Sequence, residues 1–304
     1  MKILTIGIPT REGIYYKKCF YSLSRAVQAL FMKEWAVETI ICINSPNADA
    51  LEPEIKMITR ELPQLNTRII KQDSLLLGKS LAMKRIIAET KGELVLFLDD
   101  DVEVEPDAIR VAMEIFENRS DIKLVGATPK IIRPIQASRW RNFIYDVINI
   151  QQIADVFAYP DPFIFGRFMM LRKRDVPDIP NDILNEDMYM QILFHPNVVK
   201  IKSFIRYRGV AYLSDHFKRV FRLMEGRKQA KVYAGGRLTQ KYFNDQLTKR
   251  KLNFKKIIHL RPYFLFCFVC YRIIRILTYL LKPCLYKNKK GSIVGWNRTY
   301  CILM

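Results

Sequence analysis

The sequence predicts an α/β fold, a mostly parallel sheet with flanking helices, followed by a basic, partly apolar helical C-terminal extension. Over the first 130 residues, short apolar strands alternate with helical stretches, which is typical of parallel strands joined by crossover helices. The charge is unevenly divided: residues 1–200 hold 26 Lys and Arg against 27 Asp and Glu, whereas residues 201–304 hold 24 against 3. With 304 residues the chain can bury one large core and still carry a smaller appendage.

The expected elements follow one another in regular order. The strands, each a short apolar run, are expected at Ile3 to Ile8, Val37 to Ile43, Thr67 to Lys71, Glu93 to Leu98 and around Lys123 to Ala127. The helices are expected at Tyr15 to Met32, Leu51 to Leu62, Lys79 to Thr90 and Pro106 to Asn118. In such a sheet, ligands bind outside the carboxyl ends of the strands. We therefore expect Thr10, Arg11, Asn44 and an acidic triplet to gather at that edge.

The acidic triplet is Asp99, Asp100 and Asp101, which follows the apolar run Leu94 to Leu98. Adjacent carboxylates repel one another, so the mouth of a buried strand tolerates them best where a divalent cation or backbone donors offset the repulsion. The alternative is a solvated acidic turn. The strand before the triplet and the helix-start residues Pro106-Asp107 after it favour a metal-dependent active site. No glycine-rich phosphate loop occurs on this edge, so we expect metal and side chains to hold a nucleotide.

The basic C-terminal region also contains an apolar segment, within residues 257–285. Nine consecutive apolar residues, Tyr263 to Tyr271, are followed by Arg272 and Arg275, and Ile276 to Leu281 resume the apolar pattern. A spanning helix needs about 20 mostly apolar residues. Lys and Arg flank the segment on both sides, which favours an interfacial or re-entrant helix on an anionic membrane. A true span and a buried core helix are the alternatives.

Two further features bear on the location. The first residues, MKILTIGIPT, lack the apolar stretch and cleavage site of a signal peptide, so we expect a cytosolic, reducing location. Cys267 and Cys270 are interpreted as small apolar residues on a helix, because only His259 and Cys284 lie near enough in sequence to complete a zinc site. Nucleic acid is not an expected partner, because nine consecutive apolar residues are poor phosphate contacts.

Five motifs occur in order between residues 1 and 230. They are I-P-T-R ending at Arg11, G-K-S-x-A-x-K-R from Gly78, LFLDDDVEVEPDAI from Leu96, GRFMMLRK from Gly166 and NEDMYMQIL from Asn185. Together they resemble the family 2 glycosyltransferases of the GT-A fold, a Rossmann-like α/β fold. The resemblance implies an inverting transfer of a hexosyl group from a nucleotide-sugar donor, expected to be a UDP-sugar, in glycan or polysaccharide biosynthesis. The basic, partly apolar C-terminal region adds the expectation of a saccharide or lipid-linked acceptor at a membrane. It also implies Mn²⁺ or Mg²⁺ as the cofactor.

The resemblance suggests a division of the chain. Residues 1–230 would form the glycosyltransferase domain, with a nucleotide-sugar-binding half at 1–130 and an acceptor-binding half at 131–230. Residues 231–304 would form a basic amphipathic region that associates with the cytoplasmic side of the cell membrane, peripherally or by interfacial anchoring. In the acceptor half, the aromatic residues Trp140, Tyr145, Phe157 and Tyr159 either stack on sugar rings or pack internally.

The resemblance also implies roles on the donor side. Asp101 would bind the metal, Asp99 would lie nearer the ribose or complete the metal site, and His216 would bind the metal or donate to phosphate. The remaining donor-binding residues would be Pro9, Thr10, Arg11, Asn44, Lys79, Lys84, Asp100, Arg219 and Arg222, with Arg85 as an alternative to Lys84. Asn44 departs from the family, which more often carries an acidic residue there. The lysines also suit a solvated helix face, and the arginines a membrane-facing surface.

Glu186 and Asp187 match the acidic pair of the family, which implies that Asp187 is the base that removes the proton of the acceptor hydroxyl. Glu186 would position the acceptor or the base. Taken alone, an acidic pair in the first turn of a helix is ordinary capping chemistry. Two other functions remain open at this point. One is a metal-dependent nucleotidyltransferase or phosphohydrolase that uses the same aspartates, and the other is a non-catalytic module that binds anionic membrane.

Overall fold

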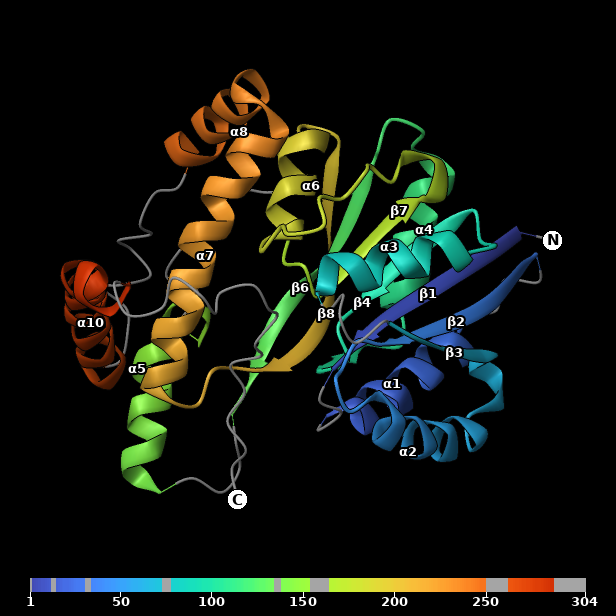
Figure 1. Ribbon diagram of the computed structural model, residues 1–304, viewed down its shortest axis with the longest axis horizontal. Coiled ribbons are helices and arrows are strands. Elements are labelled where there is room, and N and C mark those ends of the chain that lie inside the picture. Colours follow the sequence, from blue (N-terminus) through green and yellow to red (C-terminus); the bar gives the residue numbers. More distant parts are fainter. Residues whose placement is uncertain are drawn as a thin grey trace.

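A computed structural model describes residues 2–11, 15–30, 34–72, 78–133, 138–153, 164–249 and 262–286. An eight-stranded sheet runs through the molecule, and helices cover it on both sides (Figure 1). The strands are β1 (Lys2–Thr10), β2 (Trp35–Ile43), β3 (Thr67–Lys71), β4 (Leu94–Leu98), β5 (Val102–Val104), β6 (Leu124–Ile132), β7 (Phe168–Arg172) and β8 (Val198–Arg208). The α/β fold predicted from the sequence is confirmed.

The helices of the sheet layers are α1 (Tyr16–Gln28), α2 (Ala48–Arg60), α3 (Lys79–Glu89), α4 (Ala108–Asn118) and α6 (Glu186–Phe194), with short 3-10 turns at Pro63–Leu65 and Lys173–Asp175. The other helices are α5 (Arg139–Ile153), α7 (Leu213–Ala234), α8 (Gly236–Lys249) and α10 (Pro262–Tyr286). The predicted elements up to residue 132 are all present, with bounds shifted by a few residues. The largest shift is in β6, which was expected around Lys123 to Ala127 but extends to Ile132. Helix α1 was expected to reach Met32 but ends at Gln28.

The sheet is mixed, in the order β3-β2-β1-β4-β7-β6-β8-β5. The first four strands in this order are parallel, as predicted. Antiparallel β7 lies between β4 and β6, β8 is parallel to β6, and β5 pairs antiparallel with β8 at the far edge. The entry of β7 beside β4 matters for the site, because an antiparallel neighbour begins where β4 ends.

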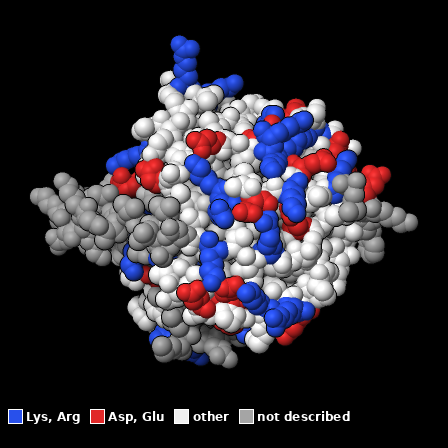
Figure 2. All heavy atoms as spheres, turned by 45° about the vertical axis from the view of Figure 1, so that its right-hand side comes forward, with Lys and Arg blue, Asp and Glu red and all other residues white. Residues whose placement is uncertain are grey.

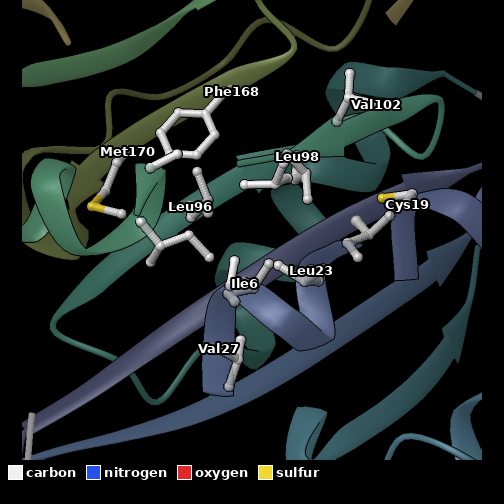
Figure 3. Packing of buried hydrophobic residues seen from close by; sticks show 14 of the residues in the cluster. Ile6, Cys19, Leu23, Val27, Leu96, Leu98, Val102, Phe168 and Met170 are labelled. Carbon is white, nitrogen blue, oxygen red and sulfur yellow. The ribbon is translucent and has the colours of Figure 1, made fainter. Parts of the chain in front are cut away.

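Side chains of the central strands alternate between two cores on opposite faces of the sheet. In β4, Leu96 and Leu98 join one core, whereas Val95 and Phe97 join the other. Figure 3 shows the first core, where Leu96 and Leu98 pack with Ile6 of β1, Leu23 of α1 and neighbouring side chains. Both faces of β4 are therefore buried in apolar cores, and the polar Asp triplet begins only where the strand leaves the sheet.

The C-terminal helices form the end of the molecule opposite α1 and α2 (Figure 1). The predicted apolar segment Tyr263 to Tyr271 lies within the 25-residue helix α10, which packs against α5. Within the described ranges, no helix is long and apolar enough to cross a membrane. Cys267 is buried and Cys270 half-buried, both as free thiols. His259 and much of the predicted basic flank, including Arg261 and Lys287, lie outside the described residues, as does the side chain of Cys284.

Candidate active site

Three parallel strands end at the same edge of the sheet, and the predicted polar residues lie at these strand ends. β1 ends at Thr10, β2 ends just before Asn44, and β4 ends just before Asp99. The backbone N–H of Asn44 donates to the Thr10 carbonyl at 2.7 Å, which fixes the first two strand ends together. The side chains of Thr10, Asn44 and Asp100 are almost fully buried. The structure therefore brings these predicted residues into one polar cluster.

Each member of the Asp triplet has a different partner. Asp100 accepts a short hydrogen bond from the Thr10 hydroxyl. Asp101 lies 3.7 Å from the guanidinium of Arg167, which stacks on Tyr207 with 4.1 Å between Cζ and the ring centroid. Asp99 pairs with Lys79, with 2.7 Å between Oδ1 and Nζ. The repulsion expected among three adjacent carboxylates is thus relieved by one hydroxyl and two cations.

Lys79 connects the two acidic motifs of the sequence. Its ammonium group contacts Asp99 Oδ1 at 2.7 Å and Glu186 Oε1 at 2.6 Å, and donates to the Gly166 carbonyl at 3.1 Å. Burial alone would lower the pKa of Lys79, but the carboxylates of Asp99 and Glu186 raise the pKa above its ordinary value. Lys79 therefore stays charged. It holds the end of β4 and the first turn of α6 together, two segments that lie 87 positions apart in the chain.

Asp187 lies beside this link and is held by backbone groups. Its Oδ2 accepts from the Gly166 N–H at 2.9 Å, and its Oδ1 accepts from the Met188 N–H at 2.7 Å. Burial and the neighbouring Glu186 carboxylate raise the pKa of Asp187 to about 6, although Lys79 and the two backbone donors limit the rise. The side chain is partly exposed, whereas Glu186 is buried. Asp187 is thus a carboxylate that can exchange a proton near neutral pH.

Gly166 makes this arrangement possible. A Cβ at this position would lie 2.8 Å from the Cβ of Asp187, closer than real side chains approach. The segment is fixed from the other side by Gln191 of α6, whose amide bonds both the N–H and the carbonyl of Ile164 at 2.9 and 2.7 Å. The start of β7 and the start of α6 are therefore locked against each other around Asp187.

The predicted nucleoside-binding residues lie on the same edge, beside the Asp triplet. Pro9 and Thr10 close β1, and Arg11 follows them, half-buried. The side-chain oxygen of Asn44 accepts from the Gly78 N–H at 3.1 Å, at the start of α3. The Nδ2 of Asn44 is buried and has no hydrogen-bond partner in the described part of the structure. This edge therefore contains a buried amide donor that a bound group would satisfy.

Lys84 is placed differently from Lys79. It lies further along α3, where its ammonium group contacts Asp178 at 2.9 Å and Asn181 Oδ1 at 2.9 Å. Asp178 is almost fully exposed, so this is a surface contact that ties α3 to the loop before α6. Arg85 pairs with Glu89 within the same helix. The donor-binding roles of Lys84 and Arg85 stay predictions.

Helix α7 carries the remaining predicted residues. Its first turns contain His216, Arg219 and Arg222. Burial and the guanidinium groups of Arg219 and Arg275 lower the pKa of His216 to about 4, so the ring is neutral at neutral pH. His216 Nε2 and Arg222 Nε are both buried and lack a hydrogen-bond partner among the described residues. The predicted metal or phosphate contact of His216 and the diphosphate contacts of the arginines stay predictions.

A comparison of the sequence with protein families identifies the chain. The profile described as "Glycosyl transferase family 2" matches residues 13–179, more than half of the chain. The chain belongs to this family. The family identity agrees with the resemblance seen in the sequence motifs, and it establishes that the protein is a glycosyltransferase. None of the curated proteins searched matches the sequence.

Solved structures show the fold of this family 2 glycosyltransferase. The mannosyltransferase PcManGT from Pyrobaculum calidifontis, in complex with GDP-Man and Mn²⁺, is 12% identical and superposes with a TM-score of 0.58. The match covers 94% of this chain and 81% of that one. S. aureus TarS 1–349 in complex with UDP-GlcNAc is 13% identical, with a TM-score of 0.47 and coverage of 89% and 80%. The first of these likenesses supports the predicted GT-A fold.

The metal expected for this glycosyltransferase would have to use few protein ligands. Within the described residues, no group of three or more His, Cys, Asp or Glu side chains is arranged to hold a metal ion. Mg²⁺ sites in phosphate-transfer enzymes commonly use one or two carboxylates together with substrate phosphates and water. Asp101 and Asp99, hard oxygen donors at the end of β4, fit such a site. The residues present are therefore compatible with a cation that binds together with the donor diphosphate.

The sequence pattern missed some contacts of the site and left others open. Arg167 contacts Asp101 because antiparallel β7 begins beside the end of β4, where Asp99 N donates to the Arg167 carbonyl at 3.1 Å. A basic residue after Gly166 was the only signal. Tyr145 packs internally, with its hydroxyl bonded to Ile132 O and Gly209 N. Trp140 is exposed, and Phe157 and Tyr159 lie outside the described residues.

Proposed function

We propose that this glycosyltransferase inverts the anomeric centre and uses Asp187 as its base. The observation that carries the proposal is the position of Asp187. Its carboxylate is fixed by two backbone N–H groups, lies next to the Lys79 link to the Asp triplet, and has a pKa raised to about 6 by burial and Glu186. A base of this strength can accept a proton from an acceptor hydroxyl as the hydroxyl oxygen attacks.

The reaction we propose is a single displacement. The acceptor oxygen forms a bond to the anomeric carbon while the bond from that carbon to the diphosphate oxygen breaks. The proton of the acceptor hydroxyl passes to Asp187, and the electron pair of the broken bond leaves with the nucleoside diphosphate. Glu186 stays anionic in its ion pair with Lys79 and holds the first turn of α6 in place.

On the donor side, the proposal assigns the nucleoside to Pro9, Thr10, Arg11 and Asn44. Asp101 and Asp99 would hold Mn²⁺ or Mg²⁺, which would supply Lewis-acid stabilisation of the diphosphate. Arg219 and Arg222 would approach the same phosphates, and the buried Nε of Arg222, which has no hydrogen-bond partner among the described residues, supports an anion there. We expect a UDP-sugar as donor and a saccharide or lipid-linked acceptor at the cytosolic face of a membrane.

A donor panel tests this function. UDP-, GDP- and dTDP-sugars would be incubated with the purified protein and Mn²⁺ or EDTA, and release of the nucleoside diphosphate would be measured. We expect release of one nucleotide that requires the cation and is lost in Asp101→Asn. With lipid-linked or saccharide acceptors, NMR of the product should show an inverted anomeric configuration. Retention of configuration would overturn the proposed displacement.

A further inference from the structure

Helices α5 and α10 present an apolar surface that nothing in the described structure covers. On α10, Phe266, Val269, Ile273 and Ile276 are between 49% and 58% exposed. Their spacing of three and four residues places them on one face of the helix. Trp140 at the start of α5 is 67% exposed. Large apolar side chains in one contiguous group at the surface usually mark an interaction site.

Neighbouring aromatic rings join the two helices at this surface. The Phe143 ring lies 5.5 Å from Trp140 and 5.8 Å from Phe266, measured between centroids. Trp140, Phe143 and Phe266 thus form a continuous aromatic row that crosses from α5 to α10. We use the name α5–α10 platform for six exposed apolar side chains of these helices together with the exposed arginines beside them. The six are Trp140, Phe266, Val269, Ile273, Ile276 and Leu277, and the arginines are Arg139, Arg141 and Arg272.

The opposite face of α10 is occupied. Cys267 and Tyr271 form a small buried cluster with Val147 and Ile150 of α5. The hydroxyl of Tyr263 donates to Asp146 at 3.0 Å, and Arg133 pairs with the same carboxylate at 3.0 Å. Because this inner face is anchored to the domain, the apolar residues of the platform remain at the surface.

Among the described side chains of α5 and α10, the exposed charges have a single sign. Helices α5 and α10 contain five Lys and Arg, and their one acidic residue is Asp146. Asp146 is buried and neutralised by Arg133. Arg139, Arg141 and Arg272 are exposed, and Arg272 lies one turn from both Val269 and Ile276 on the outward face. Apolar and aromatic side chains interspersed with exposed cations match the boundary between headgroups and acyl chains of an anionic bilayer.

We propose that the α5–α10 platform docks on an anionic lipid bilayer, with its apolar side chains inserted and its arginines among the headgroups. A second copy of the chain fits less well, because a symmetric contact would bring the arginines of two platforms together without exposed acidic partners on these helices. Helix α10 also contacts α7, which carries the predicted phosphate-binding residues. The Tyr271 ring of α10 lies 5.9 Å from that of His216, in the same helix as Arg219 and Arg222.

Flotation of the purified full chain with lipid vesicles tests the proposal without donor or acceptor, so its result is independent of the proposed reaction. We expect binding to phosphatidylcholine vesicles that contain phosphatidylglycerol, and much weaker binding to phosphatidylcholine alone. Binding should weaken when NaCl rises from about 0.1 M to about 1 M, because the screening length falls from about 10 Å to about 3 Å. Equal binding to neutral and anionic vesicles would overturn the electrostatic part of the proposal.

Variants distinguish the platform from the general basic charge of the C-terminal region. Phe266→Ser and Ile273→Ser keep every charge, and each should weaken vesicle binding about tenfold or more, since each removes a large inserted side chain. Met57→Ser, which changes a 54% exposed residue on α2 at the other end of the molecule, should bind like wild type. Arg272→Gln should weaken binding to anionic vesicles about fivefold. Circular dichroism checks that each variant is folded.

The fluorescence of Trp140 reports insertion directly. Its emission should shift to the blue on anionic vesicles and be quenched by brominated acyl chains, and the difference from Trp140→Phe isolates this residue. Unchanged vesicle binding in Phe266→Ser with Ile273→Ser would overturn the proposal. The proposal would also be overturned if the wild type did not bind vesicles but formed a dimer, and if these substitutions converted that dimer to a monomer. The platform would then be a contact between two copies of the chain.

Discussion

Two regions of the molecule differ in how their charges are paired. One is the sheet edge that carries the site, and the other is the α5–α10 platform. At the site, Lys79 is shared by Asp99 and Glu186, and Arg167 lies beside Asp101. On the helices that carry the platform, the one carboxylate, Asp146, is buried and paired, whereas Arg139, Arg141 and Arg272 are exposed. Much of the N-terminal surface resembles the site in this respect, since Lys and Arg are interspersed with Asp and Glu in Figure 2. At the site, positive and negative side chains pair with each other within the protein. On the platform, the positive side chains are available to a partner.

The comparison indicates which substitutions should affect chemistry, stability or association. Removing a charge from the site leaves another charge buried without its partner, which is costly. Removing an exposed arginine from the platform should leave the fold unchanged and weaken only the contact with an anionic partner.

The largest effect is expected for Asp187→Asn. The amide keeps the shape of the side chain and one acceptor atom, but it cannot take up the proton of the acceptor hydroxyl. We expect kcat for transfer to fall by about 10²–10⁴-fold, while donor binding is retained. Calorimetry of nucleotide binding and a transfer assay measure the two quantities. Asp178→Asn, at an exposed carboxylate in the loop before α6, should leave both unchanged, and full transfer activity in Asp187→Asn would refute its role as the base.

Lys79→Met tests the compensation at the site directly. It leaves the carboxylates of Asp99 and Glu186 together without their shared cation, so we expect a loss of about 3–5 kcal/mol in the free energy of unfolding. Lys84→Met, on the same helix but in a surface contact, should cost at most about 1 kcal/mol. Urea denaturation of both variants measures the difference. Equal losses of unfolding free energy in the two variants would show that the buried ion pairs of Lys79 contribute no more to stability than a surface ion pair.

Gly166→Ala should disturb the position of Asp187 without changing any charge. The added methyl group would lie 2.8 Å from the Asp187 Cβ, so the start of α6 or of β7 has to move. We expect a loss of about 1–3 kcal/mol in stability together with a reduced transfer rate. Gly236→Ala is the matched control, because a Cβ at that position meets nothing within 4 Å. A Gly166→Ala enzyme with wild-type activity would mean that Asp187 tolerates displacement.

The pH dependence of transfer should report the ionisation of Asp187. Its pKa is raised to about 6, and the base acts only when it is deprotonated, so activity should fall as the pH drops through about 6. Glu186→Gln removes a negative charge that raises this pKa, and the acid limb of the profile should therefore move to lower pH. A limb that stays in place would show that another group titrates there.

For the first 130 residues, the sequence was sufficient to predict the helices and all strands but the three-residue β5, because the apolar runs of the other strands are regular and separated by helical stretches. It also placed Thr10, Asn44 and the Asp triplet at one edge, since parallel strands end on the same side. It could not predict that β7 enters antiparallel beside β4, and so it missed the contact of Arg167 with Asp101. Nor could spacing show that Lys79 binds Glu186, because contacts across 107 positions depend on the assembled sheet.

The smallest and most specific effect is expected at Asn44, provided that it lines the nucleoside pocket as proposed. Its Oδ1 is satisfied by the Gly78 N–H, so only the Nδ2 donor is left to contact a base. Asn44→Asp keeps the contact with Gly78 but replaces that donor with an acceptor. Nucleotides whose base offers an acceptor there should bind at least about tenfold more weakly to the variant, and nucleotides whose base offers an N–H should bind more tightly. Dissociation constants of UDP, CDP and GDP for both proteins measure this exchange, and an unchanged ranking would place the base elsewhere.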